Sequence, residues 1–337
     1  MIESILGRLA AGENLSVDEM AATIDSVVAG ECSEGEMGVL LTALRAKGET
    51  AEEVAGATLA LRRHMTPLRT TRTGLVDTCG TGGDASGTFN ISTAAALVAA
   101  AAGVPVAKHG NRAVTSKTGS ADALEALGVN VGASVAQVER CLDELGICFC
   151  FAPLMHPSMK RVAEVRKKLA VPTIFNLLGP LANPARAQFQ VIGVGRSELR
   201  PLMAEALRLL DTKRAVVVHG EDGLDEVTLF GPTRVTEVEP GGTRQLTWTP
   251  SDFGLAPARL ETLRVESPQE SAKVIGDVLA GKAGPARDIV VLNAAAALWV
   301  AGRAETPRAC AEKVSEAIDS GAARELLLRL GELSNRT

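Results

Sequence analysis

Residues 77–93 read DTCGTGGDASGTFNIST, and this stretch decides how the rest of the chain is interpreted. A short apolar entry leads into the glycine-rich turn, and an alanine-rich run typical of a helix begins near Ser92. Glycine lets backbone N–H groups approach a ligand closely, and the first turn of a helix adds free N–H groups and a partial positive charge. We therefore interpret the stretch as a phosphate cradle. A plain strand-to-helix turn of small residues is the competing interpretation.

Composition limits the class of protein. The chain has 337 residues, 46% of them hydrophobic and 22% charged, which suits one large or two smaller globular domains. The net charge of −5 and the 3% of aromatic residues disfavour a nucleic-acid surface, which needs cationic side chains and stacking rings. The longest apolar run, 94–102, is too short to span a membrane. Six cysteines without the spacing of a disulfide framework or a zinc site predict reduced thiols and a cytoplasmic protein.

Residues 1–66 are predicted to be helical, because three capping boxes recur there. In such a box, the cap hydroxyl and a glutamate three residues later satisfy free N–H groups at the start of a helix. The pairs are Ser16/Glu19, Ser33/Glu36 and Thr50/Glu53. From residue 67 onward, short apolar strands alternate with helices, which predicts a largely parallel sheet. The predicted fold class is α/β, with a small all-helical N-terminal domain at 1–66 and a large α/β domain at 67–337.

The order of elements in the α/β part places the possible ligand site. The predicted helices are 92–102, 121–127 and 157–170, and the predicted strands are 104–107, 147–151, 189–195 and 215–219. The later chain is expected to form several short strands in 230–268, a buried strand at 289–292 and an amphipathic helical C-terminus at 306–332. Ligands of parallel sheets bind beyond the carboxyl ends of strands. The 77–93 turn and the 108–120 loop both follow short strands and could face one crevice.

A dinucleotide-binding fingerprint is matched only in part. Residues 80–85 follow the G-x-G-x-x-A pattern, but the fingerprint also needs an acid about 20 residues further on to bind a ribose hydroxyl. No Asp or Glu occurs between Asp84 and Asp122. This acid-free window contains Lys108, Arg112 and many hydroxyl and amide side chains. It therefore favours a small ligand with several phosphates over a dinucleotide.

Two further segments carry candidate binding chemistry. Asp225 and Glu226 follow a predicted strand and a turn. Adjacent carboxylates can hold Mg²⁺ together with water, although an isolated pair is more often surface charge. Arg166 can bind a carboxylate through two parallel hydrogen bonds, and a lone helical arginine is more often a surface residue. The Pro-, Gly- and Asn-rich stretch 172–185 predicts a shaped crossing or hinge.

The motifs are specific in combination. They are GTGGD at 80–84, NIST at 90–93, KHGNR at 108–112, SKTGSAD at 116–122, FNLLGPL at 175–181 and the acidic pair at 225–226. Over nearly its full length, the chain resembles the anthranilate phosphoribosyltransferase family of tryptophan biosynthesis. The resemblance implies the two-domain fold shared with pyrimidine nucleoside phosphorylases. In that fold, the helical domain and a segment near 165–185 face the large domain across a hinged cleft.

The resemblance also implies a reaction and partners. A 5-phosphoribosyl group passes from its 1-diphosphate to the amine of anthranilate, diphosphate leaves, and the anomeric centre inverts. Mg²⁺ is the implied cofactor, with two ions per active site, and a homodimer through the helical domain is the implied assembly. No nucleic acid or membrane partner is expected. Because an aromatic amine is already neutral at pH 7, we expect no single dominant catalytic residue. The rate would come from stabilising the leaving diphosphate and from holding the amine near the anomeric carbon.

Residue roles are implied by the matching motifs. The metal ligands would be Ser92, Asp225 and Glu226. Anthranilate would contact Gly80, Asn111 and Arg166, with His109 and His156 lining its channel. The sugar diphosphate would be held by Gly80, Gly83, Asp84, Thr88, Asn90, Ile91, Ser92, Thr93, Lys108, His109, Gly110, Asn111, Arg112, Ala113, Val114, Thr115, Ser116 and Ser120.

The chain departs from the family pattern at four positions. Ala170 and Pro172 stand in a segment that usually reads Leu-Gly-x-Arg-Thr, Ala113 replaces a common serine, and Met159 stands where a polar or aromatic side chain could lie. These differences concern the hinge and the anthranilate channel, not the reaction class. Two alternatives stay open: a pyrimidine nucleoside phosphorylase on the same fold, and a non-catalytic relative that binds nucleic acid.

Overall fold

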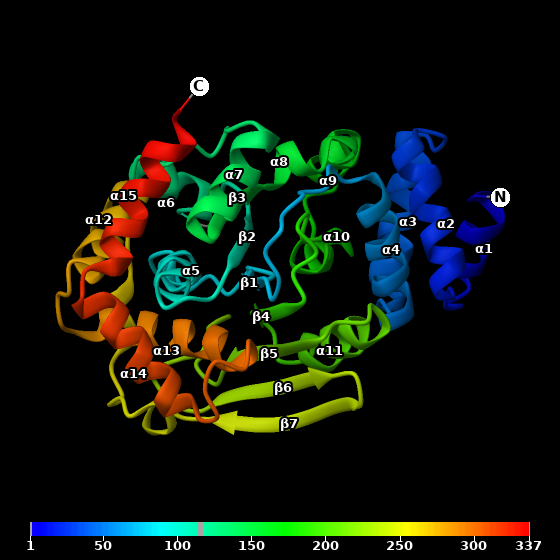
Figure 1. The fold of residues 1–337 in the computed structure, drawn as a ribbon. Coiled ribbons are helices and arrows are strands. Elements are labelled where there is room, and N and C mark those ends of the chain that lie inside the picture. Colours follow the sequence, from blue (N-terminus) through cyan, green and yellow to red (C-terminus); the bar gives the residue numbers. More distant parts are fainter. Residues whose placement is uncertain (1, 114–116, 337) are drawn as a thin grey trace.

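The computed structural model describes residues 2–113 and 117–336, without the side chain of Leu260. Three predicted phosphate ligands, Val114, Thr115 and Ser116, therefore lie outside the described residues. The molecule has a helical part on one side and a larger part built on a sheet (Figure 1). In the described ranges, every helix is too short or too polar to cross a membrane.

The helical part begins with capped helices. They are α1 Ile2–Ala10, α2 Val17–Ala29, α3 Glu34–Lys47 and α4 Ala51–His64. The predicted capping boxes at Ser16, Ser33 and Thr50 are confirmed, because each cap hydroxyl accepts from a glutamate N–H whose carboxylate accepts from the cap N–H. The carboxylate of Glu53 is fully buried and also accepts from Leu15 N at 3.0 Å. This bond ties α4 to the turn before α2.

The larger part is organised by a sheet that contains seven strands in the described residues, in the order β3-β2-β1-β4-β5-β6-β7. The strands are β1 Val76–Thr78, β2 Val106–Gly110, β3 Ile147–Phe151, β4 Phe189–Gly193, β5 Arg214–Gly220, β6 Thr233–Glu239 and β7 Gly242–Trp248. The strands from β3 to β5 in this order run parallel, while β6 and β7 pair antiparallel. The predicted fold class, a helical N-terminal domain with a largely parallel α/β domain, is confirmed.

Helices pack on both faces of this sheet (Figure 1). On one face, Val216 and Val218 of β5 share a core with α5 Ile91–Ala101 and α13 Pro285–Val300. The alternate residues Ala215 and Val217 share a second core with α11 Leu199–Leu209 and the N-terminal helices. Successive strand residues point to opposite faces, so β5 contributes to both cores. The domain division at residues 66 and 67 stays a prediction.

Further helices pack around the sheet and against the N-terminal helices. They are α6 Ser120–Ala126, α7 Val135–Leu145, α8 Ala152–Met155, α9 Lys160–Leu169, α10 Phe175–Leu178, α12 Pro268–Leu279, α14 Pro307–Asp319 and α15 Ala322–Ser334. The last two realise the helical C-terminus predicted for 306–332. Helix α9 packs with the N-terminal helices, since its Val162 and Val165 belong to their core.

Two strand predictions in the later chain are corrected. The strand predicted at 289–292 is wrong, because these residues lie in α13, whose residues are buried on every side from Ile289 onward. A short run of Ile, Val and Leu cannot be told from a buried helix by its periodicity. Pro285 in the first turn and the alanines after Asn293 favour the helix. Between 249 and 266 the chain forms 3-10 turns, so the described strands of 230–268 are β6 and β7.

The predicted crossing at 172–185 is irregular but firmly bonded. It contains α10 and a 3-10 turn at Gly179–Leu181. Side chains of β2, β4 and α4 donate to the carbonyl groups of this turn: His109 to Gly179, Gln190 to Pro180 at 2.6 Å, and Arg62 to Leu181 at 2.7 Å. The segment is therefore held in place by its neighbours rather than by its own secondary structure.

The departure at Ala170 generates a stability prediction. Ala170 ends α9 with φ 53°, a left-handed conformation in which a side chain is disfavoured. Ala170→Gly is expected to raise the free energy of unfolding by about 1 kcal/mol, measured by urea denaturation. Ala163→Gly, at an exposed position inside the same helix, should lower it by about 1 kcal/mol. A loss of stability in Ala170→Gly would contradict this account.

Candidate active site

The predicted cradle lies at the carboxyl edge of the central strands. The turn after β1 bonds back to β4 through Thr81 N and Gly193 O, which are 2.9 Å apart. Gly82 and Gly83 adopt φ of 68° and 88°, a left-handed conformation that is unfavourable for residues with a side chain. Helix α5 then starts with Asn90 as its N-cap residue. The free N–H groups of a helix start therefore follow the glycine-rich turn directly.

Three predicted site residues meet at the start of α5. The ammonium group of Lys108, only 4% exposed, donates to Thr78 O at 2.7 Å and to Ser92 Oγ at 3.2 Å. The backbone N–H of Ser92 donates to Glu226 Oε1 at 3.1 Å. The structure thus brings together one residue from the glycine-rich stretch, one from the following strand and one from the acidic pair.

The acidic pair is enclosed by protein on most sides, although part of each side chain reaches solvent. Burial raises the pKa of Asp225 well above its usual value, and the charges of Asp84 and Glu226 raise it further. Burial also raises the pKa of Glu226 to about 7, while Lys108 lowers it. Three carboxyl groups therefore share a small space with the ammonium group of Lys108. A bound cation would stabilise this arrangement.

The donors present fit Mg²⁺ held jointly with a ligand. Among the described residues, no set of three or more His, Cys, Asp and Glu side chains is arranged to bind a metal. Asp225, Glu226 and the hydroxyl of Ser92 are oxygen donors, which Mg²⁺ prefers, and this ion usually keeps waters or substrate phosphates as further ligands. The predicted metal ligands would thus hold the ion in part, with water or phosphate oxygens completing its shell.

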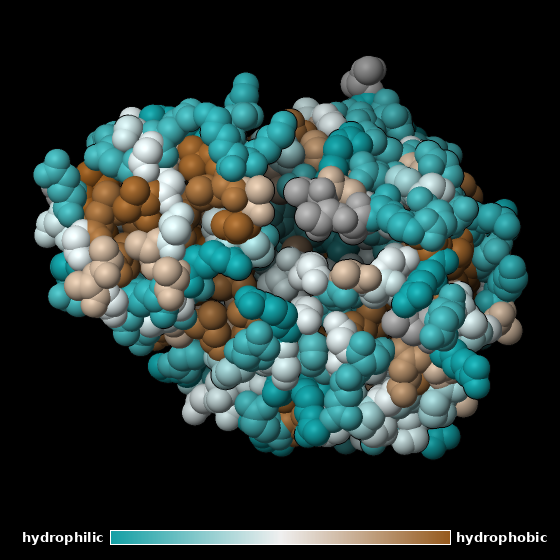
Figure 2. Space-filling view, turned by 180° about the vertical axis from the view of Figure 1, so that it is seen from behind, coloured by the Kyte–Doolittle hydropathy of each residue, from teal (hydrophilic) through white to brown (hydrophobic). Residues whose placement is uncertain are grey.

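The face of the molecule drawn in Figure 2 is hollowed near its middle. Thr78, Gly80, Ser92 and Glu226 contribute to the lining of a cavity of about 10 Å³ at this edge. A volume of this size holds about one water molecule. The hydroxyl and carboxylate groups in its lining suit a water or a small cation.

Two glycines that sequence reasoning did not assign allow the edge to form. A Cβ on Gly193 would lie 1.5 Å from Asp225 O, and one on Gly195 would lie 2.9 Å from Asp84 N. These neighbours are backbone atoms, so no side-chain rotation could make room. The signal was present in the sequence as Gly-x-Gly at the end of a predicted strand, where parallel strands place their ligands.

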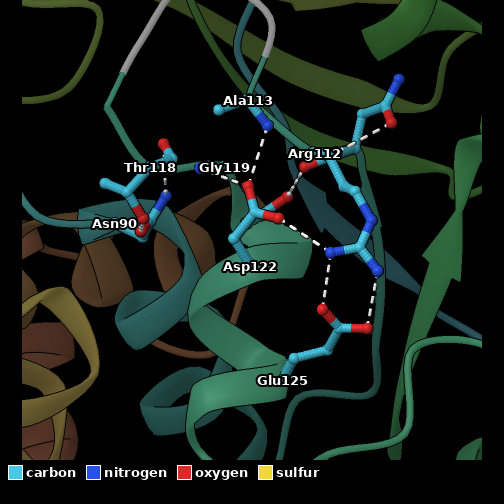
Figure 3. A network of polar contacts seen from close by, with 9 residues as sticks. Asn90, Arg112, Ala113, Thr118, Gly119, Asp122 and Glu125 are labelled. Atoms are coloured by element: carbon cyan, nitrogen blue, oxygen red, sulfur yellow. Dashed lines mark hydrogen bonds and ion pairs between the residues drawn. The ribbon is translucent and has the colours of Figure 1, made fainter. Parts of the chain in front are cut away.

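Arg112, predicted to contact phosphate, is engaged elsewhere (Figure 3). Its guanidinium donates to Asp122 at 2.9 Å and to Glu125 at 2.6 Å. The carboxylate of Asp122 also accepts from Ala113 N at 2.9 Å and from Gly119 N at 3.1 Å. One acidic side chain at the start of α6 therefore ties both ends of the loop. In this arrangement Arg112 anchors the loop.

Asn90 ties the glycine-rich stretch to the same loop (Figure 3). Its Oδ1 accepts from the hydroxyl groups of Thr118 and Ser271, both at 2.8 Å. Two residues after Thr118, Ser120 Oγ donates to Asn111 O at 3.2 Å and so links the two ends of the loop. Of the other residues predicted to bind the sugar diphosphate, Ile91 and Thr93 are buried, Thr88 and Gly110 are partly exposed, and Gly83 is exposed.

The two predicted channel histidines lie together, with ring centroids 5.1 Å apart. Burial lowers the pKa of His109 to about 3 and that of His156 to about 4, so both rings are neutral at pH 7. His109 Nδ1 donates to Gly179 O at 2.8 Å, because a carbonyl oxygen can only accept, and Nε2 therefore carries a lone pair. Within the described residues, Nε2 of each ring is buried without a hydrogen-bond partner. Such atoms are suited to bind a ligand.

Arg166 is placed by the crossing. Its Nη2 donates to Asn176 Oδ1 at 3.3 Å, and its guanidinium lies 5.9 Å from the Phe175 ring centroid. Among the described residues, no hydrogen bond, ion pair or ring contact joins Arg166 to the histidine pair or to Asn111. The residues predicted to bind anthranilate therefore form separate groups, with Arg166 on α9 and His109 and Asn111 at the end of β2.

Family models match both parts of the chain. A model described as the helical bundle domain of a glycosyl transferase family matches residues 3–65, and its a/b domain matches residues 72–324. The anthranilate phosphoribosyltransferase of Rhodopirellula baltica is 50% identical over 95% of this chain and 94% of its own length. That of Moorella thermoacetica is 48% identical over 96% and 95%.

Solved structures agree with this relationship. Anthranilate phosphoribosyltransferase from Thermus thermophilus superimposes with a TM-score of 0.93 at 44% identity, covering 98% of this chain and 99% of its own. The enzyme from Saccharomyces cerevisiae in complex with PRPP and Mg has a TM-score of 0.90 at 30% identity, covering 99% and 97%.

The close approach at Gly193 can be tested through cation binding. A cation that binds the folded state alone raises the unfolding midpoint, so Mg²⁺ is expected to stabilise the wild-type chain. Gly193→Ala should abolish that rise, because its Cβ displaces Asp225. Gly231→Ala, where an added Cβ meets no atom within 4 Å, should retain it. The midpoints are measured by differential scanning calorimetry. A Mg²⁺-dependent rise in Gly193→Ala as large as that of the wild type would disprove the role of this contact.

Proposed function

Since the chain belongs to the anthranilate phosphoribosyltransferases of the glycosyl transferase family, we propose that its site at the β1–β2 edge performs their reaction. The enzyme transfers the phosphoribosyl group of 5-phosphoribosyl 1-diphosphate to the amine of anthranilate. The products are N-(5-phosphoribosyl)anthranilate, on the route to tryptophan, and diphosphate. Ser92, Lys108 and Glu226 meet at the start of α5, and this arrangement is the observation that supports placing the reaction at this edge.

The phosphate wall would consist of the glycine-rich turn, the first turn of α5 and the loop after β2. Backbone N–H groups at a helix start bind phosphate oxygens and favour negative charge. The ammonium group of Lys108, held at 3.2 Å from Ser92 Oγ, adds a positive charge inside the protein. Asn90 and Asp122 keep the loop beside this helix start through Thr118, Ala113 and Gly119. Arg112 would reach phosphate only by leaving Asp122 and Glu125.

Mg²⁺ is the cofactor that this wall suits, as in the yeast relative solved with PRPP and Mg. Ser92, Asp225 and Glu226 would be its ligands from this chain, and we propose two ions per site. When bound, Mg²⁺ neutralises the negative charge of the leaving diphosphate. Burial and neighbouring charges raise the pKa of Asp225 and Glu226, so their ionised forms need a compensating cation, which supports a metal requirement.

The anthranilate side would be formed by His109, His156, Asn111 and Arg166, next to Gly80. A neutral His109 offers the lone pair of Nε2 to an N–H of the aromatic amine, because Nδ1 is committed to Gly179. Arg166 would bind the anthranilate carboxylate once its side chain and the β2 end come together. With a pKa of about 3, His109 is a weak base that orients the amine rather than removing its proton early.

The reaction needs placement more than acid–base strength. The amine is neutral at pH 7 and can attack as the bond from the anomeric carbon to diphosphate breaks. Its proton can leave after the new bond forms, when the nitrogen is strongly acidic. Preorganised donors at the diphosphate and a fixed amine position are therefore the main contributions of the chain.

The proposed function is tested by anthranilate fluorescence. Mixing the protein with anthranilate, 5-phosphoribosyl 1-diphosphate and Mg²⁺ should give a loss of the anthranilate signal that requires the protein, the 5-phosphoribosyl 1-diphosphate and Mg²⁺. The double variant Asp225→Asn/Glu226→Gln should lower this turnover by about 100-fold or more, because it removes the acidic metal ligands. Glu221→Gln, at an exposed residue of the same turn that pairs with Arg234, is the matched control and should keep the wild-type rate.

The outcomes separate the rival functions. Phosphorolysis of thymidine or uridine without anthranilate turnover would favour a nucleoside phosphorylase. Strong, salt-dependent DNA affinity without turnover would favour a nucleic-acid-binding relative. Near-normal turnover in the double variant would remove the acidic pair from the site.

We also propose a cytoplasmic homodimer. The six cysteines are free, five of them buried, which suits a reducing compartment. Apolar side chains gather over the helical part, on the left of Figure 2. Val39 of α3 is 51% exposed and belongs to this helical part, where a second copy would cover it.

The assembly can be measured by light scattering after size exclusion. The wild-type chain is expected to have the mass of a dimer. Val39→Asp should shift the population to monomer by placing a charge in the interface. Leu328→Asp, which changes an equally exposed leucine on α15 of the α/β part, should leave the dimer intact. A wild-type monomer, or loss of the dimer in Leu328→Asp alone, would exclude the helical part as the interface.

A further inference from the structure

The strands β1 and β2 separate at the carboxyl edge of the sheet. Their register holds one residue pair, which includes Val76. Beyond it, side chains take over the bonding: Asp77 Oδ1 accepts from His109 N at 3.1 Å, and Asn183 Nδ2 donates to Ala107 O at 2.8 Å. Backbone groups at the end of β2 are therefore satisfied by the side chains of Asp77 and Asn183, not by β1.

The two side chains also bond to each other. Asp77 Oδ2 accepts from Asn183 Nδ2 at 2.7 Å, and both residues are buried, with exposures of 0% and 2%. The amide of Asn183 cannot be reversed, because its oxygen accepts from Ala185 N at 2.9 Å while its nitrogen donates to Ala107 O. Asp77 thus faces two fixed donors. A carboxylate accepts from both, whereas an amide must turn its own donor toward one of them.

The backbone held in this way belongs to Lys108 and His109. Successive strand residues point to opposite sides. Lys108 accordingly reaches Ser92 on the phosphate wall, whereas the His109 ring meets Gly179 and His156 on the anthranilate side. One dipeptide therefore carries a contact for each proposed substrate. A shift of its backbone would move both contacts together.

We propose that Asp77, with Asn183 as its partner, is a positioning residue that sets the relative placement of the two substrates. The inference rests on the proposed function, and it assigns to Asp77 no contact with either substrate. Asp77→Asn keeps the size of the side chain, so it creates no cavity. It leaves one of the two donors, His109 N or Asn183 Nδ2, without an acceptor. A buried unpaired donor is unfavourable, and movement of the β2 end relieves it.

The test is a steady-state measurement on the full-length chain, with each substrate varied while the other is saturating. In Asp77→Asn, kcat/KM is expected to fall about 10- to 100-fold for anthranilate and for 5-phosphoribosyl 1-diphosphate alike, as is typical when a supporting contact of a site is lost. Glu53→Gln is the matched control. Its carboxylate is also fully buried and accepts from two backbone N–H groups, of Leu15 and Thr50, but it lies in the helical part. This control should lower the unfolding midpoint and leave both kcat/KM and KM unchanged for each substrate.

Asn183→Ala removes the other member of the pair and is expected to lower kcat/KM for both substrates in parallel. It also decides the question if Asp77→Asn fails to fold. A folded variant at either position with unchanged kcat/KM, or with a loss confined to one substrate, would overturn the inference. Loss of native circular dichroism in both variants would overturn it as well, since the pair would then serve folding alone. A wild-type chain without turnover would instead refute the proposed function.

Discussion

The site depends on the close approach of backbone segments at the end of β4. A Cβ on Gly193 would lie 1.5 Å from Asp225 O, and one on Gly80 would lie 3.1 Å from Gly193 O. Because the neighbour of Gly193 is a main-chain atom at a distance that no Cβ can adopt, this position tolerates glycine alone. It brings the acidic pair within a hydrogen bond of the first turn of α5, where Glu226 accepts from Ser92 N. The positive end of a helix, a lysine and the carboxylates then occupy one small space.

Charge balance explains why this space suits a cation together with an anionic ligand. Burial and the charge of Asp84 raise the pKa of Asp225 and of Glu226, which means that their ionised forms are destabilised without a compensating charge. The ammonium group of Lys108 offsets this in part. A divalent cation would neutralise the carboxylates, and the phosphates would in turn meet the helix start and the cation. The charges of the carboxylates and the helix start are therefore complementary to those of the cation and the phosphates.

Local patterns in the sequence predicted the fold class and the three capping boxes, because residue spacing alone specifies such a box. The prediction of a strand at 289–292 was wrong, because burial on all sides removes the periodicity that distinguishes a helix. Contacts between separate segments could not be read from one stretch. Arg112 meets Glu125 only through the packing of α6 against the loop, and Asp77 meets Asn183, 106 positions away, through the crossing between α9 and β4. Topology, and not local propensity, brings these residues together.

These contacts matter because the reaction offers little else to adjust. Both imidazoles are neutral, with pKa values of about 3 and 4, so neither is a strong base at pH 7. The amine needs no activation by proton removal, and the leaving diphosphate is stabilised by charge. What is left for the chain to control is distance and orientation between two bound substrates. A buried carboxylate that fixes the backbone of Lys108 and His109 acts on this variable. Its effect should therefore extend to both substrates, although it touches neither.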